Sequence, residues 1–274
     1  MHHIARLLMI MSAAALTGES TPIPADCDLT FVGLTDDQRL VRFKACRPGR
    51  VVELGFVNGL QGLDATLIGI DHRVQDGLLY GVGNAGGIYT IDTGTASASL
   101  VSQLTVPLDG TSFGVDFNPA ADRLRIISDT GQNLRHNVNP GGITIADLAL
   151  NYTAGTTAAG VVGAAYTNND LDAATGTTLF DLDGAMDQIV IQAPPNNGSL
   201  TATGKLGLDA GAIAGFDIFT KVDDAGRVLR NDGYAAIVST GTNGFYRVNL
   251  LTGEARSAGA LNDTVVDIAV RPAR

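Results

Sequence analysis

Aspartate residues recur at two fixed places in the sequence, and their side-chain oxygens are the ligands that hard divalent cations prefer. One set directly follows short apolar segments, and its members are Asp71, Asp116 and Asp217. A second set precedes these segments, in the stretches LDAT, LDGT and LDAG, and its members are Asp64, Asp109 and Asp209. We predict that the first set contacts a ligand and that the second offers a metal site, with Ca²⁺ as the candidate ion. In the alternative, which the repetition favours, each aspartate accepts backbone N–H groups in its own turn.

Other residues that could do acid–base chemistry are few. Glycoside hydrolysis needs two carboxyl groups, one acting as an acid, but the three glutamates, Glu19, Glu53 and Glu254, fall near the N-terminus or on expected outer strands. His72 follows Asp71 and could be oriented for proton transfer, whereas His136 aligns with packed strand positions. The sequence has no tryptophan and no GxSxG, P-loop or HExxH motif. These observations favour a protein that is not an enzyme.

The elements that must position the aspartates are short apolar segments that recur at a steady spacing. Four carry a central glycine, at Gly69, Gly114, Gly163 and Gly215, and a fifth is centred on Asp267. Successive centres lie 45, 49, 52 and 52 residues apart. Further short strands and polar turns follow the segments, and helical periodicity is nearly absent. A period in this range, built of strands, predicts propeller blades of four strands each.

The two ends of the sequence complete one another in this pattern. Residues 29–34, 40–45 and 51–57 have the character of the second, third and fourth strands of a blade, and residues 265–270 that of a first strand alone. Pairing them leaves no open sheet edge. A β-sandwich would explain neither the period nor the split blade. We predict an all-β fold, a five-bladed β-propeller of four-stranded blades closed by pairing the C-terminal strand with the N-terminal blade.

Two stretches carry a resemblance to a known family. LDATLIGID and FGVDFNPAADRLRIIS resemble exported bacterial proteins of the domain-of-unknown-function 4394 family. The most specific part is the motif FGVDFNP-x-x-DRLR, from Phe113 to Arg125. The resemblance covers essentially the whole chain after its first residues. It implies a propeller-like fold and export, and it implies no particular chemistry.

The first residues have the pattern of a secretory signal. A basic start is followed by the apolar run LLMIMSAAAL at 7–16 and by small and helix-breaking residues up to Pro24. Cleavage after Gly18 and cleavage after Ala25 both fit. We therefore expect a signal peptide within residues 1–25, a single propeller domain over 26–274, and export to the periplasm or the extracellular space.

The two cysteines, Cys27 and Cys46, fit an exported chain because oxidising compartments permit disulfides. If a turn at 35–38 places Leu34 opposite Arg39, continuing that antiparallel register outward places Cys27 opposite Cys46. Directly opposed residues lie close enough for a disulfide. We predict a Cys27–Cys46 bond.

The net charge of the chain narrows the classes of partner that it can bind. With 18 basic and 28 acidic residues the formal net charge is −10, which disfavours nucleic acid and anionic lipid surfaces. No apolar run approaches the ~20 residues of a membrane span. We expect a monomeric, exported, non-catalytic binding module that meets a small molecule, a glycan or a protein at one end of the central channel. The alternative is a hydrolase of lactones, esters or glycosides, with or without a metal, that uses the channel aspartates.

Overall fold

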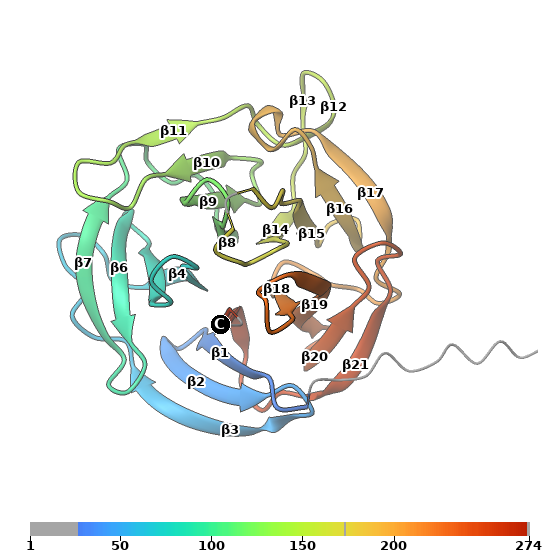
Figure 1. Cartoon of the computed structure of the whole chain (residues 1–274), viewed down its shortest axis with the longest axis horizontal. Helices are drawn as coiled ribbons and strands as arrows, with labels where there is room; N and C mark the ends of the chain where they lie inside the picture. Colours follow the sequence, from blue (N-terminus) through green and yellow to red (C-terminus); the bar gives the residue numbers. More distant parts are fainter. Residues whose placement is uncertain (1–26, 173, 273–274) are drawn as a thin grey trace, which may run out of the picture.

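A computed structural model of the chain describes residues 27–172 and 174–272. These residues form five four-stranded antiparallel sheets arranged around a central axis (Figure 1). The predicted five-bladed propeller is confirmed. The predicted signal peptide at 1–25 lies outside the described residues. No helix in the described ranges has the length and apolar character of a membrane span.

The strands of each blade follow one another from the axis to the rim, and we number the blades from the N-terminal one. Blade 1 contains β22 (Val265–Val270), β1 (Thr30–Thr35), β2 (Arg39–Lys44) and β3 (Arg47–Phe56); blade 2 contains β4 (Leu67–His72), β5 (Leu79–Gly83), β6 (Gly87–Asp92) and β7 (Ser97–Gln103); blade 3 contains β8 (Phe113–Asn118), β9 (Arg123–Ser128), β10 (Asn133–His136) and β11 (Thr144–Ala146). Blade 4 contains β14 (Val161–Tyr166), β15 (Leu179–Asp183), β16 (Gln188–Gln192) and β17 (Leu200–Lys205); blade 5 contains β18 (Ala214–Val222), β19 (Val228–Ser239), β20 (Thr242–Val248) and β21 (Ala255–Ala260). A small hairpin, β12 (Asn151–Thr153) and β13 (Thr156–Thr157), and a 3-10 turn, η1 (Pro195–Asn197), lie outside the blade sheets.

The five inner strands, β22, β4, β8, β14 and β18, contact one another in sequence around the axis. The repeated glycine is explained by how closely they approach. A Cβ atom added at Gly114 would lie 2.5 Å from the backbone nitrogen of Ala164, and one at Gly215 would lie 2.5 Å from the Cα atom of Asp267. A side chain at either place would push neighbouring inner strands apart, so the glycines set the width of the channel.

Closure of the ring occurs within blade 1. Strand β22 pairs antiparallel with β1, with Phe31 opposite Val270 and Gly33 opposite Ile268. The junction with blade 5 is filled by aromatic rings, since the Phe31 ring lies 4.9 Å from that of Tyr234 and 5.0 Å from that of Phe245. The predicted pairing of the two chain ends is confirmed.

The predicted disulfide is also present, but the register from which it was inferred is wrong. Cys27 and Cys46 are bonded, with their Cα atoms 4.7 Å apart. In the ladder between β1 and β2, however, Leu34 lies opposite Leu40 and not opposite Arg39. The turn takes one more residue than expected, with Gln38 at a positive φ of 67°. The cysteines lie beyond this ladder, in turns, where they meet without following its register. Closing this loop stabilises the fold by about 3 kcal/mol in the chain-entropy model.

Candidate functional site

Three of the predicted ligand-contacting aspartates come together in the channel. Ligand atoms of Asp71, Asp116 and Asp217 all lie within 4.8 Å of one another, and the three side chains are buried. They stand on β4, β8 and β18, with Asp71 next to the last residue of β4, Asp116 in the second half of β8 and Asp217 near the middle of β18. We call the face of the propeller where the inner strands end the exit face, and the face where they begin the entry face.

Each channel carboxylate holds the neighbouring blade. Asp71 accepts the N–H of Phe117 on β8 (2.7 Å), and Asp116 accepts that of Tyr166 on β14 (3.0 Å). In the same way Asp217 accepts the N–H of Val270 on β22 (2.6 Å), and Asp267 accepts that of Ile70 on β4 (2.7 Å). The aspartates therefore bridge blades, and do not simply cap their own turns as the architectural alternative expected.

Asp267 reaches its partner from the position that glycine occupies in the other blades. The aspartate position of β22 is taken instead by Ala269, and that of β14 by Ala165. The junction from blade 4 to blade 5 therefore has no carboxylate, and Asn169 replaces it. Its side-chain amide donates to the carbonyl of Ile218 (3.0 Å), and its N–H donates to Thr220 Oγ1 (2.9 Å). Each of the five junctions between neighbouring blades is thus bridged by a hydrogen bond between a side chain and a backbone group.

Burial dominates the protonation of this cluster. It raises the pKa of Asp71, Asp116 and Asp267 well above the usual 3.8, and the other channel carboxylates raise these pKa values further. Burial likewise raises the pKa of Asp217 to about 7, against the backbone N–H groups of Val270 and Ile218, which lower it. Carboxyl groups so close together favour states in which they share protons.

The raised pKa of Asp217 predicts the pH dependence of stability. Between its usual value of 3.8 and about 7, Asp217 holds more proton in the folded protein than in the unfolded chain, so this group makes the free energy of unfolding fall as pH rises through the window. His72, whose pKa is lowered to about 4, acts in the opposite direction below its usual 6.5. In chelator-treated buffer, Asp217→Asn is expected to flatten this fall relative to the wild-type protein. Urea unfolding at several pH values across the window measures both slopes. Parallel slopes for the two proteins would contradict the assignment.

The second predicted set of aspartates is not brought together. In the described part of the chain, the group of carboxylates close enough to share an ion is the channel group alone. Asp64, Asp109 and Asp209 precede inner strands on the entry face, each in its own blade. Asp64 accepts the N–H groups of Ala85 and Gly87 and the hydroxyl of Tyr89, so it ties the segment before β4 to the turn between β5 and β6 of the same blade and does not cap its own turn. Asp109 and Asp209 are exposed.

His72 and His136, the two histidines within the described residues, are buried. His72 is 5% exposed, and desolvation lowers its pKa to about 4. His136 is fully buried on β10, where its ring nitrogens lie 2.9 Å from Ser102 Oγ and 3.0 Å from Thr144 Oγ1. Burial lowers its pKa as well. Neither imidazole ring is hydrogen-bonded to Asp71, Asp116 or Asp217.

Two cavities open on the exit face. The larger, about 870 Å³, runs across blades 4, 5 and 1, and its polar lining includes Asn168, Asn231, Asp232, Arg247 and Arg256. A cavity of this size is in the range of sites for small ligands, roughly 300–1,000 Å³. Its lining comes from loops and strand ends of three blades, so no single stretch of sequence announces it.

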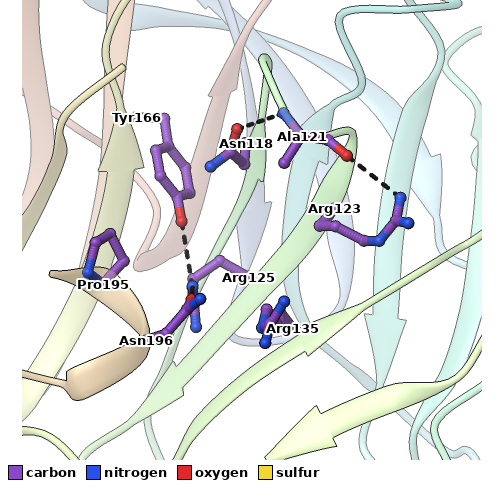
Figure 2. Close-up of a pocket in the computed structure, with 8 residues that line it drawn as sticks. All are labelled: Asn118, Ala121, Arg123, Arg125, Arg135, Tyr166, Pro195 and Asn196. Carbon is purple, nitrogen blue, oxygen red and sulfur yellow. Dashed lines mark hydrogen bonds between the residues drawn. The ribbon is translucent and has the colours of Figure 1, made fainter. Parts of the chain in front are cut away.

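The smaller cavity, about 240 Å³, lies between blades 3 and 4 (Figure 2). Three arginines line it, Arg123 and Arg125 on β9 and Arg135 on β10, together with Tyr166 and Asn196 of blade 4. The sequence reasoning did not single out these arginines. The signal was available in the DRLR part of the motif, because residues two apart on a strand face the same way.

Comparison with known proteins supports the fold. The sequence profile of a domain of unknown function, DUF4394, matches residues 39–269, and no curated protein matches the chain. A chain in the crystal structure of a nidogen/laminin complex is 9% identical, with a TM-score of 0.50, over 89% of this chain and 98% of that one. An auxiliary nutrient binding protein from Bacteroides ovatus is 14% identical, with a TM-score of 0.43, over 74% of this chain and 55% of that one.

A third solved structure, the glutaminyl cyclase of Myxococcus xanthus, is 13% identical, with a TM-score of 0.40, over 77% of this chain and 73% of that one. At such identities the likeness of the nidogen/laminin chain concerns the fold alone. The profile match, in contrast, spans most of the sequence and includes the motif from Phe113 to Arg125. The chain belongs to the DUF4394 family.

Proposed function

We propose that this protein is an exported, non-catalytic binding module that takes its ligand on the exit face. The observation that carries the proposal is that the residues lining both cavities come from loops and strand ends on this face. Clefts that combine apolar walls with a few placed polar groups are the usual sites of small ligands. The ligand classes that fit such a face are a small molecule, a glycan or a protein.

The hydrogen bonds of the channel aspartates support a role other than catalysis. Both oxygens of Asp71 accept backbone N–H groups, from Phe117 and from its neighbour His72. Both oxygens of Asp217 are similarly engaged, by Val270 and Ile218. A general acid or base must be free to exchange a proton with the substrate. Carboxylates committed to backbone donors suit a structural role better.

Export is part of the same proposal. The Cys27–Cys46 disulfide is compatible with an oxidising compartment, and the signal sequence expected within residues 1–25 would lead the chain there. After cleavage, residues 26–274 would form the single, monomeric propeller domain.

A screen followed by mapping tests the function. Glycans and small molecules are screened for those that raise the melting temperature of the protein. Hydrogen exchange then shows which backbone segments each such ligand protects, and mass spectrometry of the recovered ligand shows whether it has been altered. We expect an unaltered ligand and protection of exit-face loops, namely 119–122, 193–199 and 249–254. The entry-face turns serve as an internal control, namely 84–87, 184–187 and 240–242. Protection confined to the entry face, or a chemically altered ligand, would contradict the proposal.

A matched pair of variants shows whether the larger cavity is used. Ser257 lies on the rim strand β21 and lines that cavity, whereas Ser99 lies on the rim strand β7 away from it. Both are exposed. A ligand of the larger cavity is expected to lose affinity on Ser257→Trp and to keep it on Ser99→Trp.

The aspartate group favours a second candidate, a metal-assisted hydrolase of lactones, esters or glycosides. Asp71, Asp116 and Asp217 offer oxygen ligands within 4.8 Å of one another, and Ca²⁺ binds such ligands. Metal analysis of the purified protein and a melting curve with and without Ca²⁺ separate the candidates. A metal-free protein whose melting is indifferent to chelator favours the binding module, whereas a Ca²⁺-dependent shift favours the second candidate.

A further inference from the structure

We propose that the arginine-lined cavity between blades 3 and 4 binds the oxyanion group, carboxylate or phosphate, of a small ligand. This inference rests on the proposed function and names one of the chemistries that the exit face recognises.

The register gathers three positive charges on one face of blade 3. Arg123 and Arg125 stand two residues apart on β9, so their side chains face the same way. Arg135 lies directly opposite Arg125 on β10. Like charges at directly opposed positions destabilise a sheet pair. The arrangement is thus costly in a free blade, and it needs negative charge nearby to offset it.

The neighbouring carboxylates supply less negative charge than the three arginines carry positive charge. Asp147, with a side chain 5% exposed, accepts from Arg125 Nη1 (2.8 Å) and Arg135 Nε (3.0 Å). Asp122 is engaged elsewhere, by Arg73 at 2.5 Å. Asp181, on β15, is fully buried, its oxygens make no hydrogen bond, and burial raises its pKa, so it favours the neutral acid. The residues that line the cavity thus include three arginines and no acidic side chain, on a protein whose net charge is −10.

The arginines differ in how far their donors are used. Arg125 is buried and donates to Tyr166, Asn133, Asp147 and Asn196, so it fixes the wall between the two blades. Arg135 is one-third exposed and bonds Asp147 through Nε, which leaves both Nη atoms for a ligand.

Arg123 donates from Nη1 to the carbonyls of Ala121 and Asp122, and Figure 2 shows the first of these bonds. Its Nε and Nη2 atoms remain for a ligand. Arginine presents such paired donors to the two oxygens of a carboxylate or phosphate.

Size and lining limit the ligand. The cavity of about 240 Å³ is smaller than the roughly 300 Å³ at which sites for drug-sized ligands begin. Pro195, Ala121 and the ring of Tyr166 give it an apolar side. A small organic anion, with one charged end toward Arg123 and Arg135, fits this combination.

Titration calorimetry with two probes, succinate and inorganic phosphate, tests the inference at constant ionic strength set with sodium chloride. We expect at least one probe to bind the full mature chain, and the one that binds more tightly identifies the oxyanion. Arg135→Gln and Arg123→Gln are each expected to weaken binding about tenfold. Arg50→Gln, at an exposed arginine on β3 of blade 1, makes the same change of charge outside the cavity and should leave affinity unchanged.

Three results would overturn the inference. They are no binding of either probe, equal weakening by Arg50→Gln, and unchanged affinity in both cavity variants. Melting curves of the variants show that each is folded. If neither probe binds while a screened ligand protects the exit face, the inference fails and the proposed function stands. If neither probe binds and no ligand protects that face, both fail.

Discussion

Deleting residues 262–274 is expected to prevent the protein from folding to a soluble monomer. The deletion removes β22, which is the inner strand of blade 1 and pairs with β1. Loss of β22 exposes the edge of β1 and the buried rings of Phe31 and Phe245 at the junction with blade 5. Exposed strand edges next to apolar surface promote aggregation. Size-exclusion chromatography and circular dichroism of the truncated protein provide the measurement.

A circular permutant is the control for this deletion. Phe31 and Val270 lie opposite one another, so a short glycine–serine linker from residue 272 to residue 27 can join the ends. New termini opened between Gly62 and Leu63, in an exposed loop between blades, leave every blade continuous. We expect the permutant to fold, because pairing and not chain order completes blade 1. A folded truncation with an unchanged melting temperature would contradict the closure of the ring by β22.

The second large effect is expected at the channel aspartates, where replacement by asparagine should change the free energy of unfolding differently at Asp116 and at Asp71. Asp116 uses one oxygen, for Tyr166 N–H, whereas Asp71 uses both, for Phe117 and His72. Asparagine keeps one acceptor oxygen. Asp116→Asn should therefore change the free energy of unfolding little, while Asp71→Asn should lower it by about 1–3 kcal/mol, the cost of a buried donor left without a partner.

Alanine provides the calibration for this comparison. Asp116→Ala removes the acceptor of Tyr166 N–H and should also cost about 1–3 kcal/mol. Urea unfolding of the three variants at one pH measures the differences. Equal tolerance of Asp116→Asn and Asp116→Ala would show that the link to β14 does not stabilise the ring.

The architecture could be predicted from the sequence because its signals are local and repeated. Glycine recurs where neighbouring inner strands come closest, as at Gly114 and Gly215, and its period counts the blades. The split blade follows from the incomplete strand sets at the two ends. The disulfide was predicted correctly from a register that is wrong by one residue. The left-handed conformation of Gln38 lengthens the turn, and nothing in that residue type signals it.

The candidate site could be predicted only in part. The sequence placed Asp71, Asp116 and Asp217 at equivalent positions, and the fold brings them together. It did not indicate that they bridge to the following blade, because that depends on the distance between inner strands. The arginine cavity was missed because it needs the register of Arg125 with Arg135 and the approach of Asn196 from another blade.

The antiparallel pairing of β22 with β1 has a mechanical consequence. Residues near the two chain ends, Phe31 and Val270, are direct partners at one end of the ladder. A force pulling the two termini apart would load that last pair first and then the next, peeling the ladder open bond by bond instead of shearing all of it at once. Attached by one terminus to a surface, the propeller bears no such load. Tethered at both, it would yield first at its closure.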